Sequence, residues 1–106
     1  MAADPELAKK VMQLLAPLGD IGSRAMFGGF GIFSGADMFA LISGSALFFK
    51  VDDSNRATYV DAGSAQYKPM PYYRVPPEVL QDSAKLHDWA RASIAVAQAA
   101  PKKKRR

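Results

Sequence analysis

The segment from residue 38 to residue 51 is apolar at most positions, and this pattern limits the possible folds more than any other feature of the chain. Gly44 and Ser45 divide it into two runs with the length of strands, joined by a two-residue turn. Apolar side chains point to both sides of each run, whereas a sheet with one solvated face alternates apolar and polar residues. Each face of the predicted sheet therefore needs a cover, either helices on both sides or a second copy of the chain.

The preceding segment, residues 24–34, is also apolar but is interrupted by glycines. Gly28 and Gly29 could form a hairpin or could bend one long strand. We predict the bend, because a hairpin here would have very short arms and because glycine inside a strand often marks a bulge. With a turn at Gly35, the three predicted strands form an antiparallel meander.

Helices are predicted before and after this meander. Asp4 followed by Pro5 is a typical helix start, and Gly19 is a typical helix end. The apolar residues between them recur at helical spacing. They are Leu7, Val11, Leu14, Leu15 and Leu18.

Beyond the meander, we predict a short helix that ends at Gly63 and two further short strands in residues 65–75, where prolines exclude a central position in the sheet. A long C-terminal helix from about residue 82 to residue 100 follows. The fold class is therefore α+β: helix, three-stranded antiparallel meander, short helix, two further short strands and long C-terminal helix. The 106 residues suit one domain, residues 1–100, followed by a basic tail, residues 101–106.

The positive charge of the chain is concentrated at its end. Five of the fourteen basic residues lie in the tail, so nine basic residues face ten acidic ones in the rest of the chain, for a net charge of −1. We expect the tail to be a disordered arm that can contact nucleic-acid phosphates without sequence specificity. Its basic residues are Lys102, Lys103, Lys104, Arg105 and Arg106.

Residues for catalysis or metal binding do not form a recognisable pattern. The absence of cysteine excludes thiolate metal sites and a cysteine nucleophile, and His87 is the one histidine. We predict no catalytic residues, no metal site and no cofactor. No apolar run approaches the roughly 20 residues that span a membrane, so we expect a cytoplasmic protein without membrane contact.

Two blocks of residues resemble the N-terminal domain of the TfoX family of competence regulators. One begins at Arg24 in the glycine-punctuated segment, and the other is the Met-Pro-Tyr-Tyr block that starts at residue 70. The resemblance extends over about residues 5–98. Its most distinctive motif residues, to which we assign a structural role, are Arg24, Met26, Phe27, Gly28, Gly29 and Gly31.

Longer members of this family have a second, helical domain, so the resemblance implies a stand-alone, single-domain member. It also implies a bacterial protein linked to the regulation of DNA uptake or of competence genes. The family has no established catalytic site, which agrees with the absence of a catalytic pattern in this sequence.

The segment around residue 70 is the predicted contact surface of the body. Tyrosine and arginine are enriched at binding hot spots, and methionine adapts to partners. The alternative is that these tyrosines pack against the last helix with their hydroxyls at the surface. The predicted binding residues are Lys68, Met70, Tyr72, Tyr73 and Arg74.

Three functions remain open from the sequence. We favour a non-enzymatic regulatory module that binds an unidentified protein partner, with homodimerisation as a further expectation. The first alternative is a protein that contacts nucleic acid non-specifically through its basic tail. The second is an anion or small-ligand binder, which would require five cations to converge on one concave surface. These are Arg24, Lys50, Arg56, Lys68 and Arg74.

Overall fold

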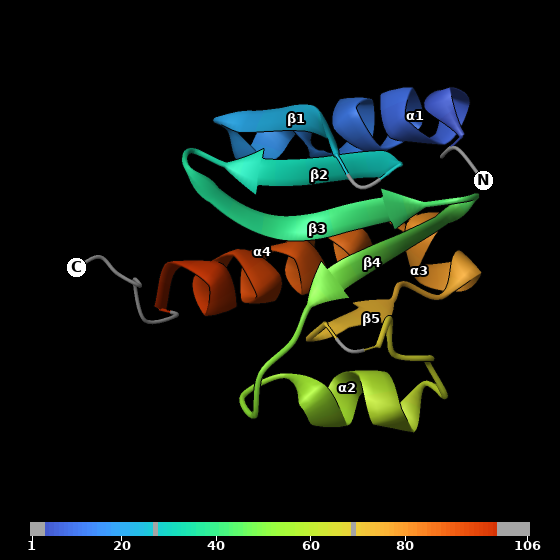
Figure 1. Ribbon diagram of the computed structural model, residues 1–106. Coiled ribbons are helices and arrows are strands. Elements are labelled where there is room, and N and C mark those ends of the chain that lie inside the picture. The colour runs from blue at the N-terminus through green and yellow to red at the C-terminus, as the bar shows by residue number, and fades with distance from the viewer. Residues whose placement is uncertain (1–3, 27, 69, 100–106) are drawn as a thin grey trace.

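The two longest helices lie behind an antiparallel sheet in the computed structural model, which describes residues 4–26, 28–68 and 70–99 (Figure 1). The five strands are arranged in chain order, β1-β2-β3-β4-β5, and the predicted α+β class is confirmed. No helix in these ranges is both long and apolar enough to cross a bilayer. The elements are α1 (Pro5–Leu15), η1 (Ala16–Leu18), β1 (Ile21–Met26), β2 (Gly29–Ser34), β3 (Asp37–Ser43), β4 (Ala46–Lys50), α2 (Arg56–Asp61), β5 (Tyr72–Arg74), α3 (Pro77–Leu80) and α4 (Ser83–Ala99).

Helix α1 starts as predicted. The Asp4 carboxylate accepts a hydrogen bond from the Glu6 backbone N–H at 2.9 Å. The predicted single helix up to Gly19 is divided, since the last turn is the 3-10 turn η1. Pro17 explains this change, because it has no N–H to donate to the preceding helical turn. Gly19 then ends the helical region with a φ of 81°.

The prediction of one bent strand at Gly28 and Gly29 is wrong. Strands β1 and β2 form a hairpin in which Met26 is paired with Gly29, and Gly28 has a φ of 73°. The arms are not short, because β1 extends back through the small residues at positions 22 and 23 to Ile21. The meander therefore contains four consecutive strands instead of three, and it is longer at its N-terminal edge than expected.

The later part of the predicted sheet is shorter than expected. Of the two strands predicted in residues 65–75, β5 forms and pairs with β4. The other is reduced to a single bridge between Gln66 and Tyr73. Prolines at positions 69 and 71 explain why a longer ladder does not form, since proline has no N–H for it.

One face of the sheet packs against the helices and forms the core. Its two largest fully buried strand residues are Phe39 and Phe49, whose ring centroids lie 5.9 Å apart. Phe39 points to this face because a bulge in β3, opposite Ile32 and Phe33, adds one residue to the strand. Helix α4 covers this face with buried residues that include Leu86, Ala90, Ser93 and Ala97.

The second face has no helical cover among the described elements, and we call it the open face. Figure 1 shows the strands in front of the helices, with the open face toward the viewer. Strand alternation and pairing place a mostly apolar set of side chains on it. These include Met26, Phe33, Met38, Leu41 and Phe48. Of the two covers that the sequence left open, helices on both sides are contradicted by the described part of the chain.

Candidate contact surface on the open face

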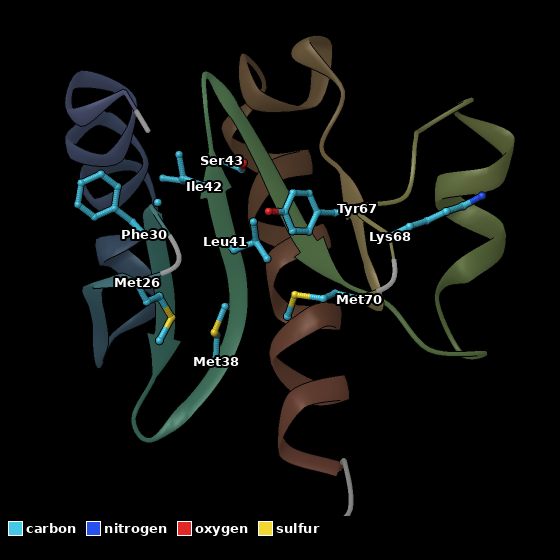
Figure 2. A pocket seen from close by; sticks show the side chains of 10 residues that line it. Met26, Phe30, Met38, Leu41, Ile42, Ser43, Tyr67, Lys68 and Met70 are labelled. Carbon is cyan, nitrogen blue, oxygen red and sulfur yellow. The ribbon is translucent and has the colours of Figure 1, made fainter. Parts of the chain in front are cut away.

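An apolar pocket of about 270 Å³ lies in the open face, and we call it the methionine pocket. Figure 2 shows strand side chains on one side of it, with Tyr67 and Met70 approaching from the loop before β5. Methionine is flexible and polarisable, so a pocket lined by it can adapt to different apolar groups. Its lining includes Met26, Met38, Leu41, Tyr67, Lys68 and Met70.

The packing of Met26 and Met38 beside the methionine pocket depends on the lack of a side chain at Gly31. A Cβ at this position would lie 2.6 Å from the Met26 sulfur and 3.2 Å from the Met38 sulfur. Gly31 is paired with Leu41, so its side of the strand faces the open face. The two thioethers therefore occupy the space that a side chain at Gly31 would take. This is a physical reason for glycine here, because its φ is not in the left-handed region.

The loop before β5 is held over the sheet by backbone hydrogen bonds. The Tyr67 N–H donates to the Tyr72 carbonyl oxygen at 2.8 Å, and the Met70 N–H donates to the Tyr67 carbonyl oxygen at 2.9 Å. The Gln66 side-chain amide donates to the Met70 carbonyl oxygen at 3.0 Å. The Tyr67 ring also packs against Phe48, with centroids 5.1 Å apart. These contacts fix one wall of the methionine pocket.

Polar atoms are few around this pocket. In Figure 2 the Tyr67 hydroxyl points toward the strands, while the Lys68 side chain extends away from the pocket toward α2. Beyond the opposite side, the Arg24 guanidinium lies over the Phe33 ring, 5.0 Å from its centroid. No acidic residue lines the pocket within the described part of the chain. The open face therefore has an apolar centre, with Arg24 and Lys68 as cations at its periphery.

The predicted contact segment is divided between different surroundings. Lys68 and Met70 line the methionine pocket. Tyr72 is buried, its hydroxyl donates to the Met38 carbonyl oxygen at 3.4 Å, and burial raises its pKa to about 12. Tyr73 points to the helix-covered side, where its ring lies 5.9 Å from that of Tyr59. Arg74 lines a separate hollow beyond β5. The five residues thus do not form one surface.

The five cations of the predicted anion site do not converge. Lys50 and Arg56 border one hollow, and Arg74 borders another. Arg56 also pairs with Asp53. Lys68 and Arg24 lie on opposite sides of the methionine pocket. The concave basic surface that an anion binder would need is therefore not formed by these residues.

The glycine-rich motif, to which we assigned a structural role, lies in the hairpin of β1 and β2. Gly28 adopts a left-handed conformation, Gly29 starts β2, and Gly31 makes room for two methionines. Arg24 and Met26 belong to β1. Phe27 lies outside the described residues, as do the tail residues 102–106, so their predicted roles have no structural description.

His87 joins two helices. Its Nε2 lies 2.7 Å from the Leu14 carbonyl oxygen, so the donor at this contact is the Nε2–H. This hydrogen bond ties α4 to α1. Among the described residues, no group of three or more histidine, cysteine or acidic side chains is placed to hold a metal ion.

Sequence reasoning missed most of the pocket. Met26 was assigned a structural role, and Met38 and Leu41 were not among the predicted binding residues. A usable signal was present, since alternate residues of the apolar strands must point away from the helices. Identifying the pocket also required the strand register and the bulge, neither of which the sequence specifies by itself.

Comparison with known proteins identifies the same family that the sequence motifs resemble. The family model of the TfoX N-terminal domain matches residues 13–97, which include all five strands and most of α4. No curated protein matches the chain. The matched region contains every described residue that lines the methionine pocket.

Proposed function

The chain belongs to the TfoX N-terminal domain family, and from this premise we propose that it is a non-enzymatic regulatory module that binds a protein partner. The site of contact in this proposal is the open face, with the methionine pocket at its centre. The proposal includes the link to competence regulation that the family resemblance implies.

The apolar, helix-free open face is the observation that supports this function most. Its apolar side chains are half-buried apart from the buried Leu41, and apolar surface with a polar rim is typical of protein interaction sites. Met26, Met38 and Met70 supply adaptable surface, and the fixed ring of Tyr67 supplies a rigid contact with a polar end. A partner side chain that entered the pocket would be desolvated at the centre of the contact, where binding energy is usually concentrated.

A non-enzymatic role is supported by the contacts of the polar side chains. His87 is bonded to a backbone carbonyl oxygen that joins two helices. Ser93 is buried and donates to the Lys50 carbonyl oxygen at 2.8 Å. Both residues therefore have structural partners, and neither lies in the methionine pocket.

A second candidate is nucleic-acid contact through the tail. The run of five basic residues at positions 102–106 supports it, because a basic arm releases counterions from a phosphate backbone. Such contacts carry no sequence information. This function would be compatible with protein binding through the open face.

Affinity capture from a nuclease-treated lysate of the source organism tests the main proposal. The full chain is compared with Met38→Glu, which places a charge in the pocket, and with Val60→Glu, which places the same charge on α2 at a side chain that is 57% exposed. Circular dichroism confirms that each variant is folded. Met38→Gln is used in addition, because a neutral polar group perturbs the sheet less.

We expect a protein that is captured by the full chain and by Val60→Glu but is lost with Met38→Glu and reduced with Met38→Gln. If the captured proteins are the same for all four chains, the open face is not the contact surface. If only nucleic acid is recovered when nuclease is omitted, nucleic-acid contact through the tail replaces protein binding as the proposed function.

A further inference from the structure

Charge on the open face has one sign. The strands contain four charged residues. Strand alternation and pairing place three of them on the side of Met26 and Phe48, which is the open face. They are Arg24, Lys50 and Arg74. The fourth, Asp37, precedes Met38 in β3 and therefore belongs to the other side. The sign does not simply reflect a basic protein, because residues 1–100 contain nine basic and ten acidic residues. The charged strand residues that alternation places on the side of the open face are thus all basic.

The four cations near this side of the sheet differ in their surroundings. Lys50 borders a hollow together with Asp52 and Asp53, and Arg74 borders one together with Glu78. Arg24 and Lys68 are both exposed, and neither belongs to the two ion pairs that the described residues form. Lys68 lines the methionine pocket at the loop before β5, with its side chain extended toward α2, and Arg24 lies over Phe33 at the β1 side of the open face.

We propose that the occupant of the open face is an acidic, amphipathic segment of another protein, with a large apolar side chain in the methionine pocket and acidic residues beside Arg24 and Lys68. This inference rests on the proposed function and adds the chemical class of the partner. Complementary charge at the rim of an apolar contact selects the partner and speeds its association. Among the described residues, no acidic side chain lines the pocket, so no like charge there repels such a segment.

The same geometry disfavours two other occupants. A symmetric dimer through this face would place the same surface of two copies in contact, so cations would meet cations. Single-stranded nucleic acid usually stacks its bases on free aromatic rings. Here Arg24 lies over Phe33, and Phe48 packs against Tyr67.

Fluorescence anisotropy with defined peptides tests this proposal on the full chain. The probe is a labelled short peptide of glutamate, leucine and phenylalanine in an amphipathic order. Two matched probes replace every glutamate by glutamine or by lysine, and a labelled oligothymidylate serves as the nucleic-acid probe. Charge reversals Arg24→Glu and Lys68→Glu are compared with Lys85→Glu, an exposed position on α4.

We expect the acidic peptide to bind about tenfold more tightly than the glutamine peptide at low salt, and the lysine peptide to bind least. The advantage should decrease as salt screens the charges. Arg24→Glu and Lys68→Glu should each weaken binding of the acidic peptide about three- to tenfold, while Lys85→Glu changes it by less than about twofold. Met38→Glu should weaken binding of both the acidic and the glutamine peptide.

Several results would overturn the inference. Equal binding of the acidic and glutamine peptides, with both lost in Met38→Glu, would reject the acidic partner but keep protein binding through the pocket. Binding of oligothymidylate alone, with the same sensitivity to Met38→Glu, would reject the protein-binding function as well. A dimer in light scattering that Met38→Glu dissociates would identify a second copy as the occupant. No detectable binding of the acidic peptide would also contradict the proposal.

Discussion

At the scale of single residues, Gly31 shows how an absent side chain shapes a surface. The sulfurs of Met26 and Met38 occupy the space beside its Cα, on the open face of β2. Both are ends of flexible side chains, so a methyl group at Gly31 would displace them without moving the backbone. Gly31 therefore determines the shape of the pocket more than the stability of the fold.

We predict that Gly31→Ala weakens partner or acidic-peptide binding while it changes the free energy of unfolding by no more than about 1 kcal/mol. The Met26 sulfur has to leave its position, and the pocket is the space available to it. Urea denaturation and anisotropy measure the two effects. Gly22→Ala is the control, because a Cβ there would have no neighbour within 4 Å. Loss of stability by several kcal/mol with unchanged binding would contradict this view.

Two buried tyrosines make stability sensitive to alkaline pH. Burial raises the pKa of Tyr59 to about 12 and that of Tyr72 to about 12, from an ordinary value of 10.0. The folded state therefore holds these protons more tightly than the unfolded state. Their contribution to stability is complete below the unfolded pKa and is lost as the pH rises through the folded pKa.

We expect the free energy of unfolding to fall between about pH 10 and pH 12, by on the order of 2 kcal/mol for Tyr59. Urea denaturation across this range measures the change. In Tyr59→Phe the decrease should be smaller, since one of the two titrating groups is absent. An equal decrease in both proteins would show that other groups cause the alkaline unfolding.

At the scale of elements, the hairpin of β1 and β2 shows what the sequence could and could not predict. Helix starts at Asp4 and stops at Gly19 and Gly63 follow from local chemistry, and they were predicted correctly. The hairpin depended on whether residues 21–23 join the sheet. Glycine and serine at positions 22 and 23 give little strand signal, and pairing with β2 decides their conformation.

The conformation of Gly28 offers a direct test of this hairpin. Its φ of 73° is costly for residues with a side chain, so Gly28→Ala should lower the free energy of unfolding by about 1–2 kcal/mol. Gly22→Ala in β1 should have no such cost. Gly28→Asn should lie between them, because asparagine tolerates this conformation better. If Gly28→Ala and Gly22→Ala were equally stable, a bent strand would describe this segment better.

At the scale of the whole molecule, the strands have apolar side chains on both faces. This pattern predicted that both faces of the sheet are covered, but not which elements cover each face. Helices α1 and α4 cover one face, and the loop containing Tyr67 and Met70 partly covers the other. The pocket could not be read from the sequence, because it depends on a bulge in β3 and on how this loop lies over the sheet. Long-range register, unlike a helix cap, has no local signature.

The net positive charge of the chain lies in its tail, whereas the rest of the chain is nearly neutral. We expect the five basic residues of the tail to contact phosphates without the domain. We predict that the full chain binds random duplex DNA weakly, with a logarithmic salt slope no steeper than about −4.5, and that a chain ending at Ala100 does not bind. A salt series in an anisotropy assay measures both. Retained binding by the shortened chain would assign nucleic-acid contact to the domain itself.

The methyl signals of the methionines provide the most direct test of the open face as the binding surface. The side chains of Met26, Met38 and Met70 line the pocket, whereas Met12 packs against the core from α1. In a sample labelled with ¹³C at the methionine methyl groups, titration with the captured partner or the acidic peptide should shift the three pocket signals and leave that of Met12 unchanged. Shifts confined to Met12, or no shift at saturating partner, would contradict binding through the open face.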